Sequence, residues 1–108
     1  MTIEIDVQAK IRELVTANPV VLFMKGSKDF PVCGFSGRVI QILSELNVNF
    51  LDVNVLEDDA IRQGIKIYAN WPTIPQLYVN GEFVGGCDIM NEMFESGELA
   101  TLLRDHQG

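Results

Sequence analysis

The sequence predicts one α/β domain, residues 1–108, with a four-stranded mixed sheet flanked by about five helices. A chain of 108 residues is long enough to bury a single core without disulfides or metals. Helical and strand-like apolar patterns alternate along it. Near its end, Asn80-Gly81 separates two short apolar stretches, which is a strong hairpin signal. We therefore expect two parallel strands first and an antiparallel pair after them.

The first half of the chain alternates between helix and strand. A first helix is predicted from apolar residues spaced along one face, namely Val7, Ile11, Leu14 and Val15. It ends at Asn18-Pro19, and residues 20–24 form a continuous apolar run that suits a strand buried on both faces. A loop over residues 25–32 follows. Helical spacing then returns at Val39, Leu43 and Leu46, so Cys33 is expected at or just before a helix N-terminus.

The second half supplies the remaining elements. Residues 50–55 alternate as in a strand, and a short third helix is closed by Asn70. Residues 76–79 and 82–85 flank the hairpin turn. Asp88 is expected to cap the next helix, which Gly97 ends before a last helix rich in leucine. This order of elements is that of a thioredoxin-like domain.

Composition and charge exclude several classes of function. A hydrophobic content of 47% with 21% charged residues indicates a globular chain. No apolar run approaches the roughly 18 residues of a membrane span, and the first ten residues lack the pattern of a signal peptide. Two cysteines fit a reducing compartment, so we expect a soluble, cytoplasmic protein. The net charge of −7 argues against nucleic acid or an anionic membrane as the main partner.

The segment Cys33-Gly34-Phe35-Ser36 carries the most chemical information. It places one thiol where a disulfide oxidoreductase has two, with a hydroxyl in the second position. The chemistry of Cys33 therefore needs a thiol from elsewhere: Cys87, another protomer, or a small thiol such as glutathione. An inert buried cysteine is the alternative. The expected helix N-terminus favours a reactive thiolate, because it lowers the pKa of a thiol.

Four motifs in order resemble the monothiol glutaredoxins of the CGFS type over nearly the whole chain. They are Met24-Lys25-Gly26, Cys33-Gly34-Phe35-Ser36, Asn70-Trp71-Pro72-Thr73-Ile74-Pro75-Gln76 and Gly85-Gly86-Cys87-Asp88. The resemblance implies a thioredoxin-like fold that binds glutathione and a [2Fe–2S] cluster bridging a homodimer. It also implies a role in iron–sulfur carriage to apo iron–sulfur proteins and in iron homeostasis, with weak disulfide reductase activity. A BolA-like protein is a further partner of the family.

The resemblance assigns roles to individual residues. Cys33 becomes the nucleophile and the iron ligand. Lys25 and Arg62 pair with carboxylates of glutathione, although by pattern alone both are ordinary solvated side chains. Thr73 and Ile74 offer backbone groups to the ligand, with a cis Ile74–Pro75 bond. The backbone N–H groups of Cys87 and Asp88 hold the γ-glutamyl carboxylate.

Ligand counting and thiol chemistry leave two functions open. A [2Fe–2S] cluster of the usual kind needs four sulfur ligands, and this chain has two separated cysteines, so two chains and two glutathiones would supply the set. The alternative is a glutathione-dependent monothiol oxidoreductase that removes glutathione from mixed disulfides with Cys33. The insertion-like segment 26–32 before the thiol favours the carrier.

Cys87 is interpreted as a backbone donor that occasionally forms a disulfide with Cys33. Phe35 either shields a cluster or packs.

Overall fold

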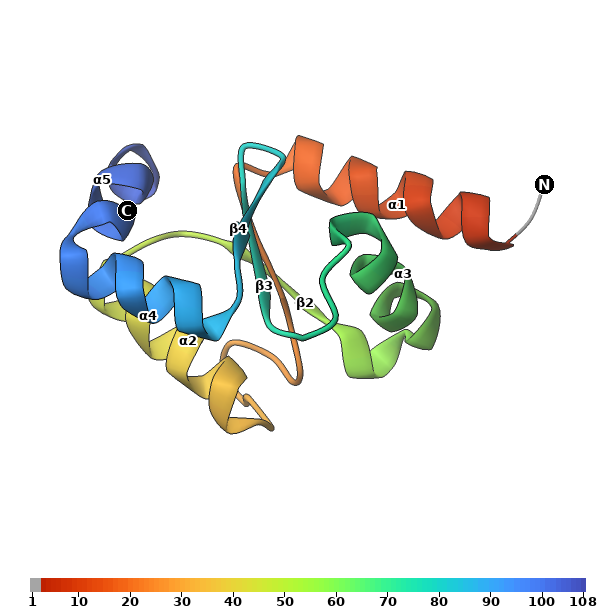
Figure 1. The fold of residues 1–108 in the computed structure, drawn as a ribbon, viewed down its shortest axis with the longest axis horizontal. Coiled ribbons are helices and arrows are strands. Elements are labelled where there is room, and N and C mark those ends of the chain that lie inside the picture. Colours follow the sequence, from red (N-terminus) through yellow and green to blue (C-terminus); the bar gives the residue numbers. More distant parts are fainter. Residues whose placement is uncertain (1–2) are drawn as a thin grey trace.

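A four-stranded mixed sheet lies between two layers of helices (Figure 1). The computed structural model describes residues 3–108, with side chains from Val7 onward. The helices are α1 (Ile3–Ala17), α2 (Gly34–Glu45), α3 (Asp59–Ala69), α4 (Cys87–Ser96) and α5 (Glu98–Leu103), with short 3-10 helices η1 (Val55–Glu57) and η2 (Arg104–His106). The strands are β1 (Val20–Met24), β2 (Leu51–Asn54), β3 (Gln76–Val79) and β4 (Glu82–Gly85).

The sheet has the strand order β2-β1-β3-β4. Strand β1 runs parallel to β2 and antiparallel to β3, and β3 pairs with β4 across the Asn80-Gly81 turn. Both turn residues have positive φ, as a tight hairpin turn requires. The predicted thioredoxin-like arrangement, a parallel pair followed by an antiparallel pair, is confirmed.

Strand β1 separates two hydrophobic cores. Val20, Leu22 and Met24 pack toward α2, α4 and α5, whereas Val21 and Phe23 pack toward α1 and α3. All five side chains are buried, which explains why this strand is apolar at every position instead of alternating. The carboxyl end of β1 is thereby fixed in the centre of the sheet, and the chain leaves it directly into the loop that carries Lys25 and leads to Cys33.

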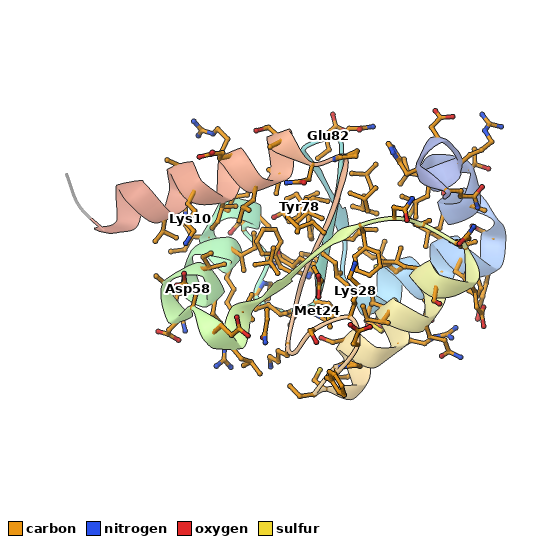
Figure 2. All side chains as sticks on the ribbon, turned by 180° about the vertical axis from the view of Figure 1, so that it is seen from behind. Lys10, Met24, Lys28, Asp58, Tyr78 and Glu82 are labelled. Carbon is orange, nitrogen blue, oxygen red and sulfur yellow. The ribbon has the colours of Figure 1, made fainter. Side chains whose placement is uncertain are left out.

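Helices α1 and α3 pack closely on one face of the sheet. Figure 2 shows Lys10 and Asp58 on the outside of this pair and Tyr78 inside the molecule. Asp58 caps α3, accepting a hydrogen bond from the N–H of Ile61 at 3.2 Å, and its carboxylate lies 3.4 Å from the ammonium of Lys10. Within residues 3–108, no helix combines the length and the hydropathy needed to cross a bilayer.

Two sequence predictions need correction. The second strand spans Leu51–Asn54 instead of residues 50–55; it ends at Asn54 because the Asn54 side chain accepts the N–H of Leu56 and starts η1 at Val55. Asp88 does not cap α4: the cap is Gly86, whose extended backbone starts the helix at Cys87 and places Asp88 in the first turn. The carbonyl of Gly86 accepts the N–H of Met90 at 3.0 Å, so the helix begins without a side-chain cap.

Candidate functional site

Cys33 is the N-cap residue of α2, as the sequence predicts. Its backbone is extended, with φ −143° and ψ 142°, and its carbonyl accepts the N–H of Gly37 at 2.9 Å. The side chain is partly exposed and forms no disulfide. The thiol therefore sits beside the unpaired N–H groups of a helix start, where a negative charge is stabilised. An inert core cysteine is excluded by this placement.

The pKa of the Cys33 thiol is lowered. Burial acts in the opposite direction, and it is outweighed by hydrogen bonds from the backbone and hydroxyl of Ser36, by the backbone N–H of Phe35 and by the charge of Lys25. Each of these favours the thiolate over the thiol. The site thus favours the ionised form of Cys33, which is both a nucleophile and a soft metal ligand.

Ser36 has a second connection, which the sequence pattern did not indicate. Its side chain is 0% exposed, and its hydroxyl accepts the backbone N–H of Lys25 at 3.1 Å. One hydroxyl thus links the end of β1 to the first turn of α2 while stabilising the Cys33 thiolate. Serine in place of a resolving cysteine is therefore also a structural element of the site.

The loop before the thiol is fastened to strand β2. Gly26 donates its N–H to the Asn54 side chain at 3.0 Å, and Lys28 donates its N–H to Asp52 at 2.8 Å. Gly26 has φ +92°, and a Cβ there would overlap the carbonyl of Phe30, so only glycine fits this turn. The polar face of β2 thereby holds the insertion-like segment that precedes Cys33.

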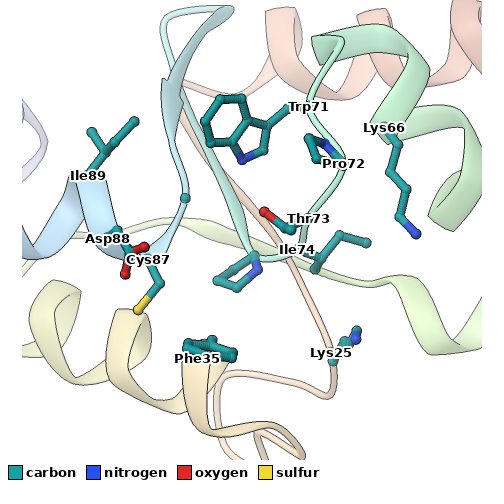
Figure 3. A pocket seen from close by; sticks show the side chains of 12 residues that line it. Lys25, Phe35, Lys66, Trp71, Pro72, Thr73, Ile74, Cys87, Asp88 and Ile89 are labelled. Atoms are coloured by element: carbon teal, nitrogen blue, oxygen red, sulfur yellow. The ribbon is translucent and has the colours of Figure 1, made fainter.

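A pocket of about 350 Å³ is bordered by Phe35, two residues after Cys33 (Figure 3). Five segments that are far apart in the sequence contribute to it. Its lining consists of Lys25, Phe35, Lys66, residues 71–75 and residues 86–89. Phe35 is 64% exposed at the pocket edge, so it does not serve core packing.

The pocket brings together five of the predicted ligand-binding residues: Lys25, Thr73, Ile74, Cys87 and Asp88. Cys33 and Arg62 are not among the lining residues. Cys33 is coupled to the pocket by the backbone of Phe35 and the charge of Lys25. Arg62 lies one turn before Lys66 on α3, and within the described part of the chain its buried Nε atom has no hydrogen-bond partner. Its contact with a ligand stays a prediction.

Lys66 is a site residue that the sequence pattern did not indicate. It projects from α3 toward the pocket on the side of Lys25, whereas Cys87 and Asp88 lie on the opposite side (Figure 3). In sequence, Lys66 is one charged position on an amphipathic helix and resembles any solvated lysine. Only the packing of α3 against the sheet places it at the pocket. Its i+4 spacing from Arg62 is the signal that could have found it.

The two ends of the pocket differ in charge. Lys25 and Lys66 form a cationic end, and the opposite end holds the first N–H groups of α4 together with the Asp88 carboxylate. Between them the loop 71–75 presents backbone, and the expected cis Ile74–Pro75 bond is confirmed. Such a pocket suits a short extended molecule with carboxylates at both ends and an ammonium beside one of them.

Glycine brings the two walls of the pocket close to each other. A Cβ on Gly86 would lie 3.3 Å from the carbonyl oxygen of Pro75 and 3.5 Å from Nε1 of Trp71. A larger residue would separate the start of α4 from the loop 71–75. Gly86 thus allows this close approach, and at Gly85, which has φ +155°, a Cβ would overlap the Ile89 side chain at 2.8 Å.

Cys87, the first residue of α4, differs from Cys33 in ionisation. Burial and the neighbouring Asp88 carboxylate raise the pKa of the Cys87 thiol, and the charge of Arg38 opposes them. Asn91 donates to its sulfur at 3.6 Å and in turn accepts from Arg38 at 2.8 Å. The pKa values of the two thiols therefore shift in opposite directions, so Cys33 ionises more readily than Cys87.

Comparisons with known proteins agree with this geometry. The family model described as Glutaredoxin matches residues 20–84. The chain is 59% identical to an uncharacterized monothiol glutaredoxin of Synechocystis sp. over 91% of this chain and 92% of that protein. It is 62% identical to monothiol glutaredoxin-S14, chloroplastic, of Arabidopsis thaliana, over 82% of this chain, and spans about half (51%) of that longer relative.

Solved structures of glutaredoxins match the fold of this chain. Reduced poplar apo GrxS14 matches with a TM-score of 0.83 at 51% identity, covering 97% of this chain and 96% of that one. A buckwheat glutaredoxin–glutathione complex matches with a TM-score of 0.84 at 25% identity, covering 95% and 92%. The second structure places a glutathione complex on the same fold.

Proposed function

This chain belongs to the glutaredoxin family, among the monothiol glutaredoxins, and on that premise we propose that it binds glutathione and carries a [2Fe–2S] cluster between two copies of itself. The main support for this proposal is the arrangement of residues around Cys33. A partly exposed thiol with a lowered pKa stands at the start of α2, and its neighbours Lys25 and Phe35 line a pocket with cations at one end and a helix N-terminus at the other. Cluster delivery to apo iron–sulfur proteins and a part in iron homeostasis follow from the same proposal, as does a BolA-like partner.

The pocket supports glutathione as the ligand. Glutathione carries two carboxylates, one ammonium and two peptide groups. Lys25, Lys66 and, one turn away, Arg62 suit the glycine carboxylate, and the first N–H groups of α4 suit the γ-glutamyl carboxylate. The Asp88 carboxylate suits the ammonium. The neighbour with a glutathione complex supports the same assignment.

The donor set supports sharing of the cluster between chains. The described residues contain no group of three or more histidine, cysteine or acidic side chains close enough to hold a metal ion. A [2Fe–2S] cluster needs four ligands, usually thiolates. Two Cys33 thiolates with two glutathione thiolates complete that number, and the lowered pKa of Cys33 favours the ionisation that iron binding requires.

The same thiolate supports a second function. Cys33 could attack the glutathione sulfur of a mixed disulfide, which forms a Cys33–glutathione disulfide and releases the substrate as a thiolate. A second glutathione thiolate would then attack the glutathione sulfur, forming oxidised glutathione and restoring Cys33. The raised pKa of Cys87 favours this monothiol route over an internal disulfide, because a neutral thiol attacks slowly.

Anaerobic reconstitution tests the main proposal. Purified chain is supplied with iron, sulfide and glutathione, and its mass and iron content are compared with those of a sample that lacks glutathione. We expect a coloured dimer that depends on glutathione and a monomer without it. A chain that holds its cluster as a monomer, or equally well without glutathione, would refute the proposal. Turnover of a glutathionylated peptide, measured in parallel, tests the second function.

A further inference from the structure

Gln76 is a buried amide beneath an exposed loop. Its side chain is 0% exposed at the start of β3, whereas Trp71, Pro72 and Thr73 are exposed at the surface. These loop residues belong to no helix or strand, so hydrogen bonds within an element do not fix them. A polar side chain buried at such a position needs hydrogen-bond partners to offset its desolvation.

The amide nitrogen and the amide oxygen of Gln76 have different hydrogen-bond partners. Its Nε2 donates to the carbonyl oxygen of Trp71 at 3.2 Å and to that of Thr73 at 3.1 Å. Its Oε1 accepts from the hydroxyl of Tyr78 at 3.1 Å. Because carbonyl oxygens only accept, the amide nitrogen Nε2 must face the loop, and the amide oxygen Oε1 must face Tyr78.

Tyr78 is itself held in place by aromatic neighbours. Its ring lies 5.6 Å from that of Phe23 and 5.5 Å from that of Phe83, centroid to centroid. The hydroxyl is buried, and burial raises its pKa, so it remains a donor. A chain of hydrogen bonds therefore runs from the aromatic core through Gln76 to the loop.

The bond to Thr73 determines the direction of the next N–H group. Within residues 3–108, the cis peptide bond is Ile74–Pro75, so the Thr73–Ile74 peptide is trans. In a trans peptide the C=O and N–H groups point in opposite directions. With the Thr73 carbonyl turned inward to Gln76, the Ile74 N–H points away from Gln76, on the side where Thr73 and Ile74 line the pocket.

We propose that Gln76 is a positioning residue for ligand binding, which aims the Ile74 N–H into the pocket by fixing the Trp71 and Thr73 carbonyls from inside. The ligand class rests on the proposed function: a γ-glutamyl tripeptide whose backbone carbonyl accepts this N–H. Gln76 does not touch the ligand. It removes the conformational freedom of the loop before binding, and a preordered loop loses less entropy when the ligand arrives.

The test replaces Gln76 with methionine, which has similar length and no hydrogen bonds. Leu77→Val is the matched control, because Leu77 is the buried neighbour in β3 and this change lowers stability without touching the loop. We expect Gln76→Met to raise the Kd for glutathione about tenfold, the equivalent of one ordinary hydrogen bond, with Leu77→Val within about twofold of wild type. Equal affinities for Gln76→Met and wild type, or equal losses in both variants, would overturn the proposal.

Backbone order parameters measured by NMR provide a readout without ligand. Thr73 and Ile74 should become more mobile on the picosecond to nanosecond scale in Gln76→Met, while strand β1 stays rigid. If that variant does not fold, Tyr78→Phe removes the donor to Gln76 and should loosen the same two residues to a smaller extent. Unchanged order at Thr73 and Ile74 would overturn the proposal. A wild-type chain that does not bind glutathione would refute the proposed function, and the order parameters would still decide the role of Gln76.

Discussion

Removal of the Ser36 hydroxyl should affect stability and thiol ionisation together. In Ser36→Ala, the backbone N–H of Lys25 loses its acceptor at 3.1 Å. An unsatisfied N–H in the interior costs about 1 to 3 kcal/mol, and Lys25 is partly buried, so we expect a loss of about 1 to 2 kcal/mol in the free energy of unfolding. Urea denaturation measures this loss.

The same variant should raise the pKa of Cys33, because the thiolate loses the hydrogen bond from the Ser36 hydroxyl. The thiolate is the form that reacts, and a higher pKa lowers its population at any given pH below that pKa. The pH profile of alkylation by iodoacetamide should therefore shift to higher pH. Ser44→Ala, an exposed position on the same helix, is the control and should leave both measurements unchanged. If the alkylation profile of Ser36→Ala coincides with that of wild type, Ser36 does not stabilise the thiolate.

Three further predictions concern stability and ligand binding. Asp58→Ala should lower the free energy of unfolding by about 1 kcal/mol through loss of the cap, and exposed Lys10→Ala by less than about 0.5 kcal/mol. The backbone hydrogen bond from Ile61 lowers the pKa of Asp58, so the contribution of Asp58 to stability is present above the ordinary pKa of an aspartate and lost as the pH falls through the lowered value. Urea titrations of wild type and Asp58→Ala at several pH values measure this contribution. A difference in stability that does not change with pH would contradict it. Gly26→Ala should destabilise the fold by more than about 1 kcal/mol, because its Cβ meets the Phe30 carbonyl at positive φ, and a thermal melt equal to wild type would contradict this. Lys66→Ala should raise the Kd for glutathione by about fivefold in calorimetry, and an unchanged Kd would remove Lys66 from the site.

The sequence predicts the fold well because each element has its own local signal. The apolar run at residues 20–24 requires burial on both faces, and the structure places it between two cores. Asn80-Gly81 determines the hairpin turn through positive φ. The two errors, the bounds of the second strand and the cap at Asp88, both concern element ends. There, side-chain hydrogen bonds and glycine conformations decide at which of several neighbouring residues an element begins or ends.

The candidate site is predicted less completely, for a physical reason. Cys33 is recognised because its position before a helix is itself a chemical signal. Lys66 and Gln76 have no such signal: one resembles a solvated charge, and the other resembles a polar strand residue facing water. Their roles arise only from packing, since α3 brings Lys66 to the pocket and burial of Gln76 turns it toward the loop. Patterns within one segment cannot reveal contacts between segments.

The iron content of two cysteine variants tests whether Cys33 is the iron ligand. After anaerobic reconstitution with glutathione, Cys87→Ser should keep about one cluster per dimer, because the proposed contribution of Cys87 is a backbone N–H that the substitution retains. Cys33→Ser should bind no cluster, since a hydroxyl is not ionised at neutral pH and is a poor iron ligand. Retention of the cluster by Cys33→Ser together with its loss from Cys87→Ser would show that Cys33 is not the iron ligand and would move the ligand to Cys87.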